Sequence, residues 1–166
     1  MDTLSHGLWG GIAFGRKSRK LFWQSFAFGV VPDILSFGIF FVLTFLGFAS
    51  RPNWASGPPP ADAIPSYIYT LYDLTHSLVI FAVVFLVVWL LLRKPVYTML
   101  AWPLHILVDI PTHSLQFFPT PFLWPLFDGI RVDGIPWSHP YIFIPNVVFL
   151  AVLYFWFYWK SKKERI

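Results

Sequence analysis

The sequence predicts an all-α integral membrane protein, a compact bundle of about four transmembrane segments plus a short N-terminal helix. Hydrophobic residues make up 57% of the 166 residues and charged residues only 12%, whereas a soluble domain has about 25% charged residues. Long apolar runs alternate with short basic clusters and with proline-rich polar stretches. We interpret residues 1–166 as a single membrane-embedded domain.

The first two apolar runs differ in length. Residues 3–15 are rich in glycine and too short to cross a hydrocarbon core of about 30 Å, which predicts a re-entrant or half-depth helix. Residues 21–48 are long enough, but Pro32 removes a backbone donor and is expected to kink the helix or to restart it. Asp33 follows directly and is a candidate cap for the second half.

The rest of the chain alternates between spans and polar connections. Three further runs are predicted to be membrane-spanning helices: 66–92, 95–114 and 140–159. Two proline-rich stretches are predicted to be external loops: 49–65 and 115–139. The chain then ends in a basic tail at 160–166.

Lysine and arginine gather in three clusters, at 16–20, 93–94 and 160–165. Basic residues beside apolar spans mark the cytoplasmic side of a membrane. One topology places all three clusters there, with both proline-rich loops on the outside. The pattern predicts a multi-pass protein of the inner or plasma membrane with a cytoplasmic tail, and gives no indication of nucleic-acid binding.

Ionisable side chains interrupt the apolar run at 95–114. His105, Asp109 and His113 follow one another at intervals of four residues, so they share one face of a helix. Burying such groups in an apolar span costs several kcal/mol unless something compensates. Two imidazoles and a carboxylate predict a bound cation as that compensation, although an intramembrane ion pair between His105 and Asp109 is an alternative.

Other acids and histidines lie toward the outer ends of their segments: Asp2, His6, Asp73, His76 and His139. Asp33 lies near mid-membrane, at the expected break in its helix. Several have simpler readings, because Asp2 and Asp73 suit helix N-caps and His139 suits a wet interface. Ionisable residues inside a membrane are nevertheless functional by default. We therefore expect several segments to direct these groups to one site in the outer half of the bilayer.

The residue types limit the chemistry. The chain has no cysteine, and its only glutamate is Glu164 in the tail, so a metal site must use histidine and aspartate. Such ligands suit zinc above all, and also manganese or iron, with enough groups for one or two ions. A Ser-His-Asp hydrolase is disfavoured for two reasons. Ser77 and Ser114 each directly follow a histidine, and adjacent residues of a helix point about 100° apart, so neither serine faces that histidine. The chain also has no G-x-S-x-G elbow.

Four blocks stand in order, residues 2–7 (DTLSHG), 29–33 (GVVPD), 74–78 (LTHSL) and 105–109 (HILVD), followed by Thr120-Pro121 and LWPL at 123–126. They resemble the membrane-bound metal-dependent hydrolase family, which includes LexA-regulated inner-membrane proteins. The H-x-x-x-D block is also similar to one in zinc-dependent phospholipase C proteins. The family resemblance covers roughly residues 1–126 and implies metal-binding roles for these residues: His6, Asp33, His76, His105 and Asp109.

The chain departs from the family pattern before the T-H-S block. Family members often carry H-R-G where this sequence has Leu71, Tyr72 and Asp73. The missing histidine makes Asp73 and His113 candidates for a catalytic role, as a further ligand, a general base or a partner that orients a ligating histidine.

The combined expectation is a membrane-embedded metal-dependent hydrolase that acts on an ester or phosphoester of a lipid or amphipathic substrate, such as a phospholipid. Arg131 is a candidate phosphate partner from the second loop, or part of a solvated turn. An ion or proton transporter, or a metal-carrying membrane protein, is the alternative. The cytoplasmic halves of the spans lack ionisable residues, which favours the enzyme. A scaffold with a structural metal is the third reading.

Overall fold

Six α-helices carry the fold in the computed structural model, which describes residues 1–53, 59–60 and 63–163. They are α1 (Thr3–Phe14), α2 (Arg19–Phe45), α3 (Ser66–Thr75), α4 (Leu78–Leu92), α5 (Ala101–Thr112) and α6 (Pro140–Lys163). A 3₁₀ turn (Tyr97–Leu100) leads into α5. The described residues contain no strand, so the predicted all-α class is confirmed for them.

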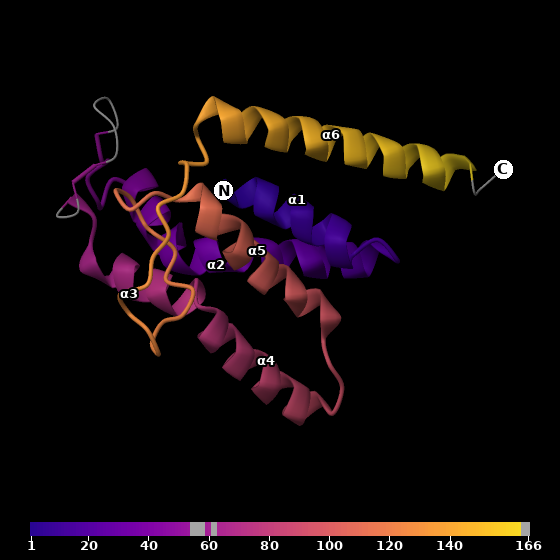
Figure 1. The fold of residues 1–166 in the computed structure, drawn as a ribbon, viewed down its shortest axis with the longest axis horizontal. Helices are drawn as coiled ribbons and strands as arrows, with labels where there is room; N and C mark the ends of the chain where they lie inside the picture. The colour runs from indigo at the N-terminus through magenta and orange to yellow at the C-terminus, as the bar shows by residue number, and fades with distance from the viewer. Residues whose placement is uncertain (54–58, 61–62, 164–166) are drawn as a thin grey trace.

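The helices lie roughly along one direction, with α1, α2 and α5 in the middle, α6 along one edge and α4 along the other (Figure 1). The start of α1 and the connection between α5 and α6 lie at one end of the bundle. The links from α1 to α2 and from α4 to α5 lie at the other end. These two links carry the basic clusters 16–20 and 93–94, so both clusters lie at the same end of the bundle.

The predicted count of about four membrane spans is not confirmed. Two helices are long and apolar enough to cross a membrane, α2 and the 140–157 part of α6. The bent pair of α3 and α4 makes a third if the two count as one span. The run at 95–114 folds as the 3₁₀ turn and α5, and the 12 residues of α5 are too few for a full crossing.

The predicted single helix over 66–92 is wrong, because α3 and α4 meet at a bend of 60°. The hydroxyl of Ser77 accepts hydrogen bonds from the backbone N–H groups of Val79 and Ile80 and so caps a new helix. Leu78 N–H donates to the carbonyl of Phe122 in the second loop, 3.0 Å away. The bend leaves His76 at the junction between the two helices.

Pro32 also behaves differently from the expectation. Helix α2 continues through it without restarting, so Asp33 lies within a helix instead of capping one. Proline lacks the N–H that would bond to the carbonyl four residues earlier, which loosens the preceding turn. The carbonyl of Gly29, in that turn, accepts a hydrogen bond from the ring of His105.

Helices α1 and α2 approach closely at Gly29. A Cβ atom at this position would lie 2.5 Å from the backbone oxygen of His6 and 3.1 Å from Cα of Gly7. Close backbone contact through small residues is a common way to pack helices in membranes. Helix α1 itself begins at Asp2, whose carboxylate accepts from the backbone N–H of Ser5 at 2.9 Å, which confirms the N-cap reading. The close approach at Gly29 sets the backbone of His6 against the middle of α2.

We expect Gly29→Ala to lower the free energy of unfolding by about 1–3 kcal/mol, because the new methyl group meets backbone that cannot move aside. Gly38→Ala on the same helix is the matched control, since its Cβ would meet only the Ile34 side chain at 3.4 Å. That control should gain about 0.5–1 kcal/mol from helix propensity. Chemical unfolding in detergent, followed by circular dichroism, measures both; equal effects would contradict the tight α1–α2 contact.

Candidate metal centre

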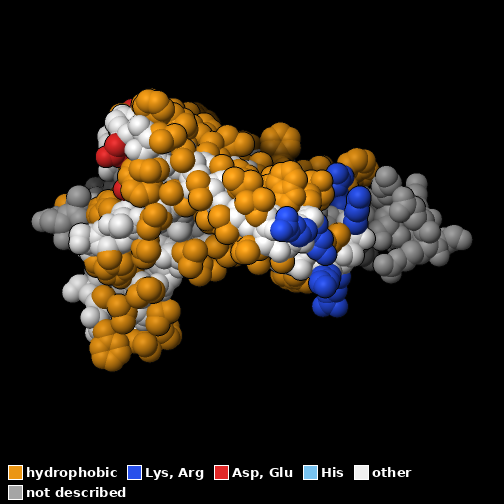
Figure 2. Space-filling view, turned by 90° about the horizontal axis from the view of Figure 1, so that it is seen from below, with side chains coloured by type: hydrophobic (Ala, Val, Ile, Leu, Met, Phe, Trp, Pro, Cys, Tyr) orange, Lys and Arg blue, Asp and Glu red, His pale blue; other side chains and the backbone are white. Residues whose placement is uncertain are grey.

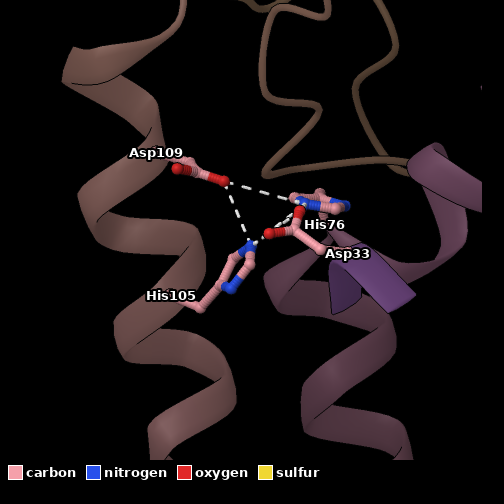
Figure 3. Close-up of side chains that lie close together, drawn as sticks. All are labelled: Asp33, His76, His105 and Asp109. Atoms are coloured by element: carbon pink, nitrogen blue, oxygen red, sulfur yellow. Dashed lines mark hydrogen bonds and ion pairs between the residues drawn. The ribbon is translucent and has the colours of Figure 1, made fainter. Parts of the chain in front are cut away.

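Four predicted ligands come together in the buried interior of the fold. Asp33 projects from α2, His76 from the α3–α4 junction, and His105 and Asp109 from α5, and all four side chains point toward one another (Figure 3). One ligand atom from each lies within 4.8 Å of the others. The side chains of His76, His105 and Asp109 are at most 1% exposed, and that of Asp33 is 12% exposed.

The separations match those of atoms that share one metal ion. His105 Nε2 lies 3.1 Å from His76 Nε2 and 3.1 Å from Asp109 Oδ2. Asp33 Oδ1 lies 3.5 Å from His76 Nε2 and 3.7 Å from His105 Nε2, and His76 Nε2 lies 3.7 Å from Asp109 Oδ2. Two ligands about 2.0–2.1 Å from a zinc ion at the tetrahedral angle are about 3.3–3.4 Å apart. The donor set therefore fits a metal ion.

Hydrogen bonds on the far sides of the two rings determine which nitrogens are free. His105 Nδ1 lies 2.7 Å from the carbonyl oxygen of Gly29, which can only accept, so Nδ1 carries the proton. His76 Nδ1 faces the carbonyl of Tyr72 at 3.3 Å and the hydroxyl oxygen of Thr75 at 3.0 Å. In neutral rings both Nε2 atoms then carry a lone pair instead of a proton, and these lone pairs are directed at each other. Metal-ligating histidines are held in this way, by an N–H bond to backbone on the opposite side of the ring.

Charge and hydrogen bonding point in the same direction. Two carboxylates and two neutral imidazoles carry a net charge of −2, and the Met1 ammonium beside Asp109 offsets one of these charges, which leaves a negative site that attracts a cation. Buried charges without compensation cost several kcal/mol each. Asp109 Oδ2 is buried and has no hydrogen-bond partner among the described residues. A bound cation would satisfy both the charge and this oxygen.

His6 and His113 lie on the other side of the Asp109 carboxylate. His6 Nε2 lies 2.9 Å from Asp109 Oδ1, and His113 Nδ1 lies 3.4 Å from the same oxygen. The N-terminal ammonium of Met1 also contacts Oδ1. The His6 ring stacks on that of His105, with centroids 3.5 Å apart. The structure thus brings six of the seven predicted site residues together, with Asp109 between two pairs of histidines.

Asp73 is the predicted site residue that the structure places elsewhere. Its Oδ1 atom lies 3.8 Å from the Arg131 guanidinium, which also pairs with Asp128 at 3.2 Å. Two predicted functional groups, the carboxylate of Asp73 and the guanidinium of Arg131, therefore pair with each other. Asp73 does not belong to the group of described residues that could hold a metal. His139 is exposed, and its ring nitrogen accepts from Tyr141 N–H at 3.4 Å.

Several supporting residues were missed by sequence reasoning. The Thr3 hydroxyl donates to Asp33 Oδ2 at 2.7 Å, and the Tyr72 ring stacks on His76 with centroids 3.8 Å apart. Trp102 Nε1 donates to the Thr75 carbonyl at 2.6 Å, which ties α5 to the end of α3. Thr3 and Thr75 lie within two of the four sequence blocks, and this position was the one feature of the sequence that pointed to a role at the site.

We expect Thr75→Val to weaken metal affinity by about 10–100-fold, because the hydroxyl is one of the two groups that hold Nδ1 of His76. Thr98→Val is the matched control: the Thr98 hydroxyl is also buried, but it has no hydrogen-bond partner among the described residues. Competition with a metal-sensitive chelator dye measures both affinities. A loss of affinity in the control as large as that in Thr75→Val would contradict this role.

A cavity of about 310 Å³ reaches the centre, and Asp33 and His113 both line it. The partial exposure of Asp33 shows that the centre is not sealed on this side. The cavity therefore gives access to the Asp33 carboxylate and to His113, whereas a structural metal site is usually closed.

No protein-family model matches the chain, and no curated protein or solved structure is significantly similar to it. The family resemblance of the four sequence blocks accordingly stays a prediction, and the function is inferred from the geometry of the site.

Proposed function

We propose that the protein is a membrane-embedded metal-dependent hydrolase that acts on an ester or phosphoester of a lipid or amphipathic substrate. The observation that carries this proposal is the convergence of two histidine lone pairs and two carboxylates on one buried point, beside a cavity. Zinc suits these ligands best, and manganese or iron would bind the same groups.

The chain's own residues divide the work. Asp33, His76, His105 and Asp109 would hold the ion, which when bound polarises a carbonyl or phosphoryl oxygen and activates water. The Thr3 hydroxyl fixes one oxygen of Asp33 and so orients the other toward the histidines. His113 lines the cavity and contacts Asp109, which suits a general acid or base that exchanges a proton with the substrate.

The outer surface supports a bilayer setting. Large apolar side chains of α2, α4 and α6 are exposed along much of their length, among them Phe45 at 82% and Leu91 at 77%. In Figure 2 the lysines and arginines gather toward one end of the visible face and the acids toward the other. This arrangement fits an inner or plasma membrane with the basic links on the cytoplasmic side and the metal centre in the outer half.

We expect His113→Asn to keep its metal and to lower the rate of hydrolysis by about 10²–10⁴-fold, the usual contribution of a general acid or base. His139→Asn, at an exposed histidine, is the matched control and should keep its rate. Metal content by elemental mass spectrometry and turnover of a nitrophenyl phosphodiester and a nitrophenyl ester test both variants. Loss of metal in His113→Asn would make His113 a ligand instead.

The same preparation separates the enzyme from the transporter. Wild-type protein with bound metal that hydrolyses neither ester class, yet carries metal or protons into reconstituted vesicles, would contradict the hydrolase.

A further inference from the structure

We propose that the cavity beside the metal centre binds the hydrocarbon chain of a single-chain amphipathic substrate whose ester or phosphoester head lies at Asp33 and His113. This inference rests on the proposed function and specifies its substrate. The cavity volume of about 310 Å³ is at the lower end of the range for small-molecule sites, about 300–1,000 Å³. That size favours one chain over a bulky diacyl lipid.

The lining of the cavity combines polar and apolar residues. The polar ones are Asp2, Thr3, Asp33 and His113, and Asp33 and His113 are next to the candidate metal centre. The apolar lining includes Phe40, Ile68 and Phe118, which are buried residues of one core cluster. A sugar or peptide there would leave its polar groups without partners, at a cost of a few kcal/mol each. A hydrocarbon chain has no such groups, and its head would reach the residues that offer charge.

The apolar wall is built together with the metal centre. Phe118 has a φ of +48°, a left-handed conformation that is strained for a bulky residue. The Tyr72 hydroxyl donates to the Phe118 carbonyl at 2.9 Å, and the Tyr69 ring stacks on that of Phe118 at 4.8 Å. Tyr72 also stacks on His76. One tyrosine thus holds both a ligand of the centre and the aromatic wall of the cavity.

The cavity also reaches the surface on which lipid would lie. Phe41 lines it and is 64% exposed on the apolar face of α2. A chain could therefore enter sideways from the bilayer without crossing water, while its head moves to the metal centre. This route fits a substrate that is itself dissolved in the membrane.

The test is photo-crosslinking with dodecyl phosphate that carries a diazirine at the end of its chain. The hydrocarbon chain of the probe is already shielded from water in a detergent micelle, so its transfer to the protein changes the free energy little. The position of the crosslink is therefore a better readout than the affinity for the probe. We expect wild-type protein to be labelled on α2 near Phe40, on α3 near Ile68 and at Phe118. Excess unlabelled dodecyl phosphate should compete, and inorganic phosphate should not remove the labelling of the apolar wall.

Two variants that fill the cavity, Phe40→Trp and Phe37→Trp, should reduce this labelling by about tenfold, because the larger ring takes the space of the chain. Phe45→Trp makes the same substitution on the same helix at an exposed position and should leave it unchanged. Circular dichroism and metal content confirm that each variant is folded, and two filling variants guard against the misfolding of one.

Labelling spread over the exposed faces of α4 and α6, unaffected by either filling variant, would overturn the inference. Hydrolysis of short-chain esters together with such dispersed labelling would support the hydrolase and contradict only the chain-binding site. Labelling of the cavity without any metal-dependent hydrolysis would support the chain site and contradict the hydrolase.

Discussion

Replacing Asp109 with asparagine is expected to weaken metal binding more than about a hundredfold. Loss of a residue that merely orients a ligand already costs about 10–100-fold, and Asp109 is itself a ligand in the proposed centre. The substitution keeps the shape of the side chain but removes the charge that faces His105 on one side and His6 on the other. Metal content of the detergent-purified protein, measured by elemental mass spectrometry, gives the result directly.

Asp73→Asn is the matched control, because Asp73 pairs with Arg131 outside the group that could hold a metal. It should keep the one or two ions per chain that we expect in wild type. His105→Ala provides a second way to remove a ligand. Both site variants must retain helical circular dichroism. Full metal occupancy in folded Asp109→Asn and His105→Ala would contradict the centre, and metal loss from Asp73→Asn would return Asp73 to the ligand set.

Metal removal by a chelator is expected to abolish hydrolysis and to lower the melting temperature, with both effects reversed by adding zinc, manganese or iron. Without the ion, two carboxylates and two imidazole lone pairs face one another in a buried space. Free metal at about 100-fold above its dissociation constant stabilises the folded state by about 2.7 kcal/mol. In a domain of this size that corresponds to about 5–10 °C.

The double variant Asp33→Asn/Asp109→Asn should show no response to the chelator, because the charge that attracts the cation is gone. The helix content and the hydrolysis of the chelated wild type separate the scaffold from the enzyme. A scaffold with a structural metal predicts that the chelated wild type loses its helices altogether. Retained helices with lost hydrolysis would support the enzyme, and retained hydrolysis without metal would contradict it.

Some of this architecture follows from local pattern alone. The spacing of His105 and Asp109 by four residues places them on one face of a helix whatever the rest of the chain does. Apolar composition over long runs predicts helices, because in a bilayer each backbone group must be satisfied within its own segment. The absence of cysteine rules out thiolate ligands from composition alone. The helical class and the pairing of His105 with Asp109 could therefore be predicted from local pattern, whereas Asp33 and His76 were expected from the family resemblance.

Other features depend on contacts between distant segments. The break at Ser77 was not predicted, because the run contains no proline or glycine there and the break depends in part on a hydrogen bond to the loop carbonyl of Phe122. Asp33 looked like a cap because Pro32 precedes it, yet α2 continues and the carboxylate meets Thr3 and His76 instead. The pairing of Asp73 with Arg131 joins groups far apart in the chain.

The sequence by itself determined which chemistry is available: long apolar runs that form helices, and histidine and aspartate as the candidate metal ligands. Tertiary structure alone decided which of these residues meet. Asp73 lies only three residues before His76, but the Asp73 side chain contacts Arg131, whereas the His76 side chain belongs to the candidate metal centre. Ligand spacing within one helix follows from backbone geometry, whereas convergence from several elements depends on how bends, glycine contacts and loops pack those elements together.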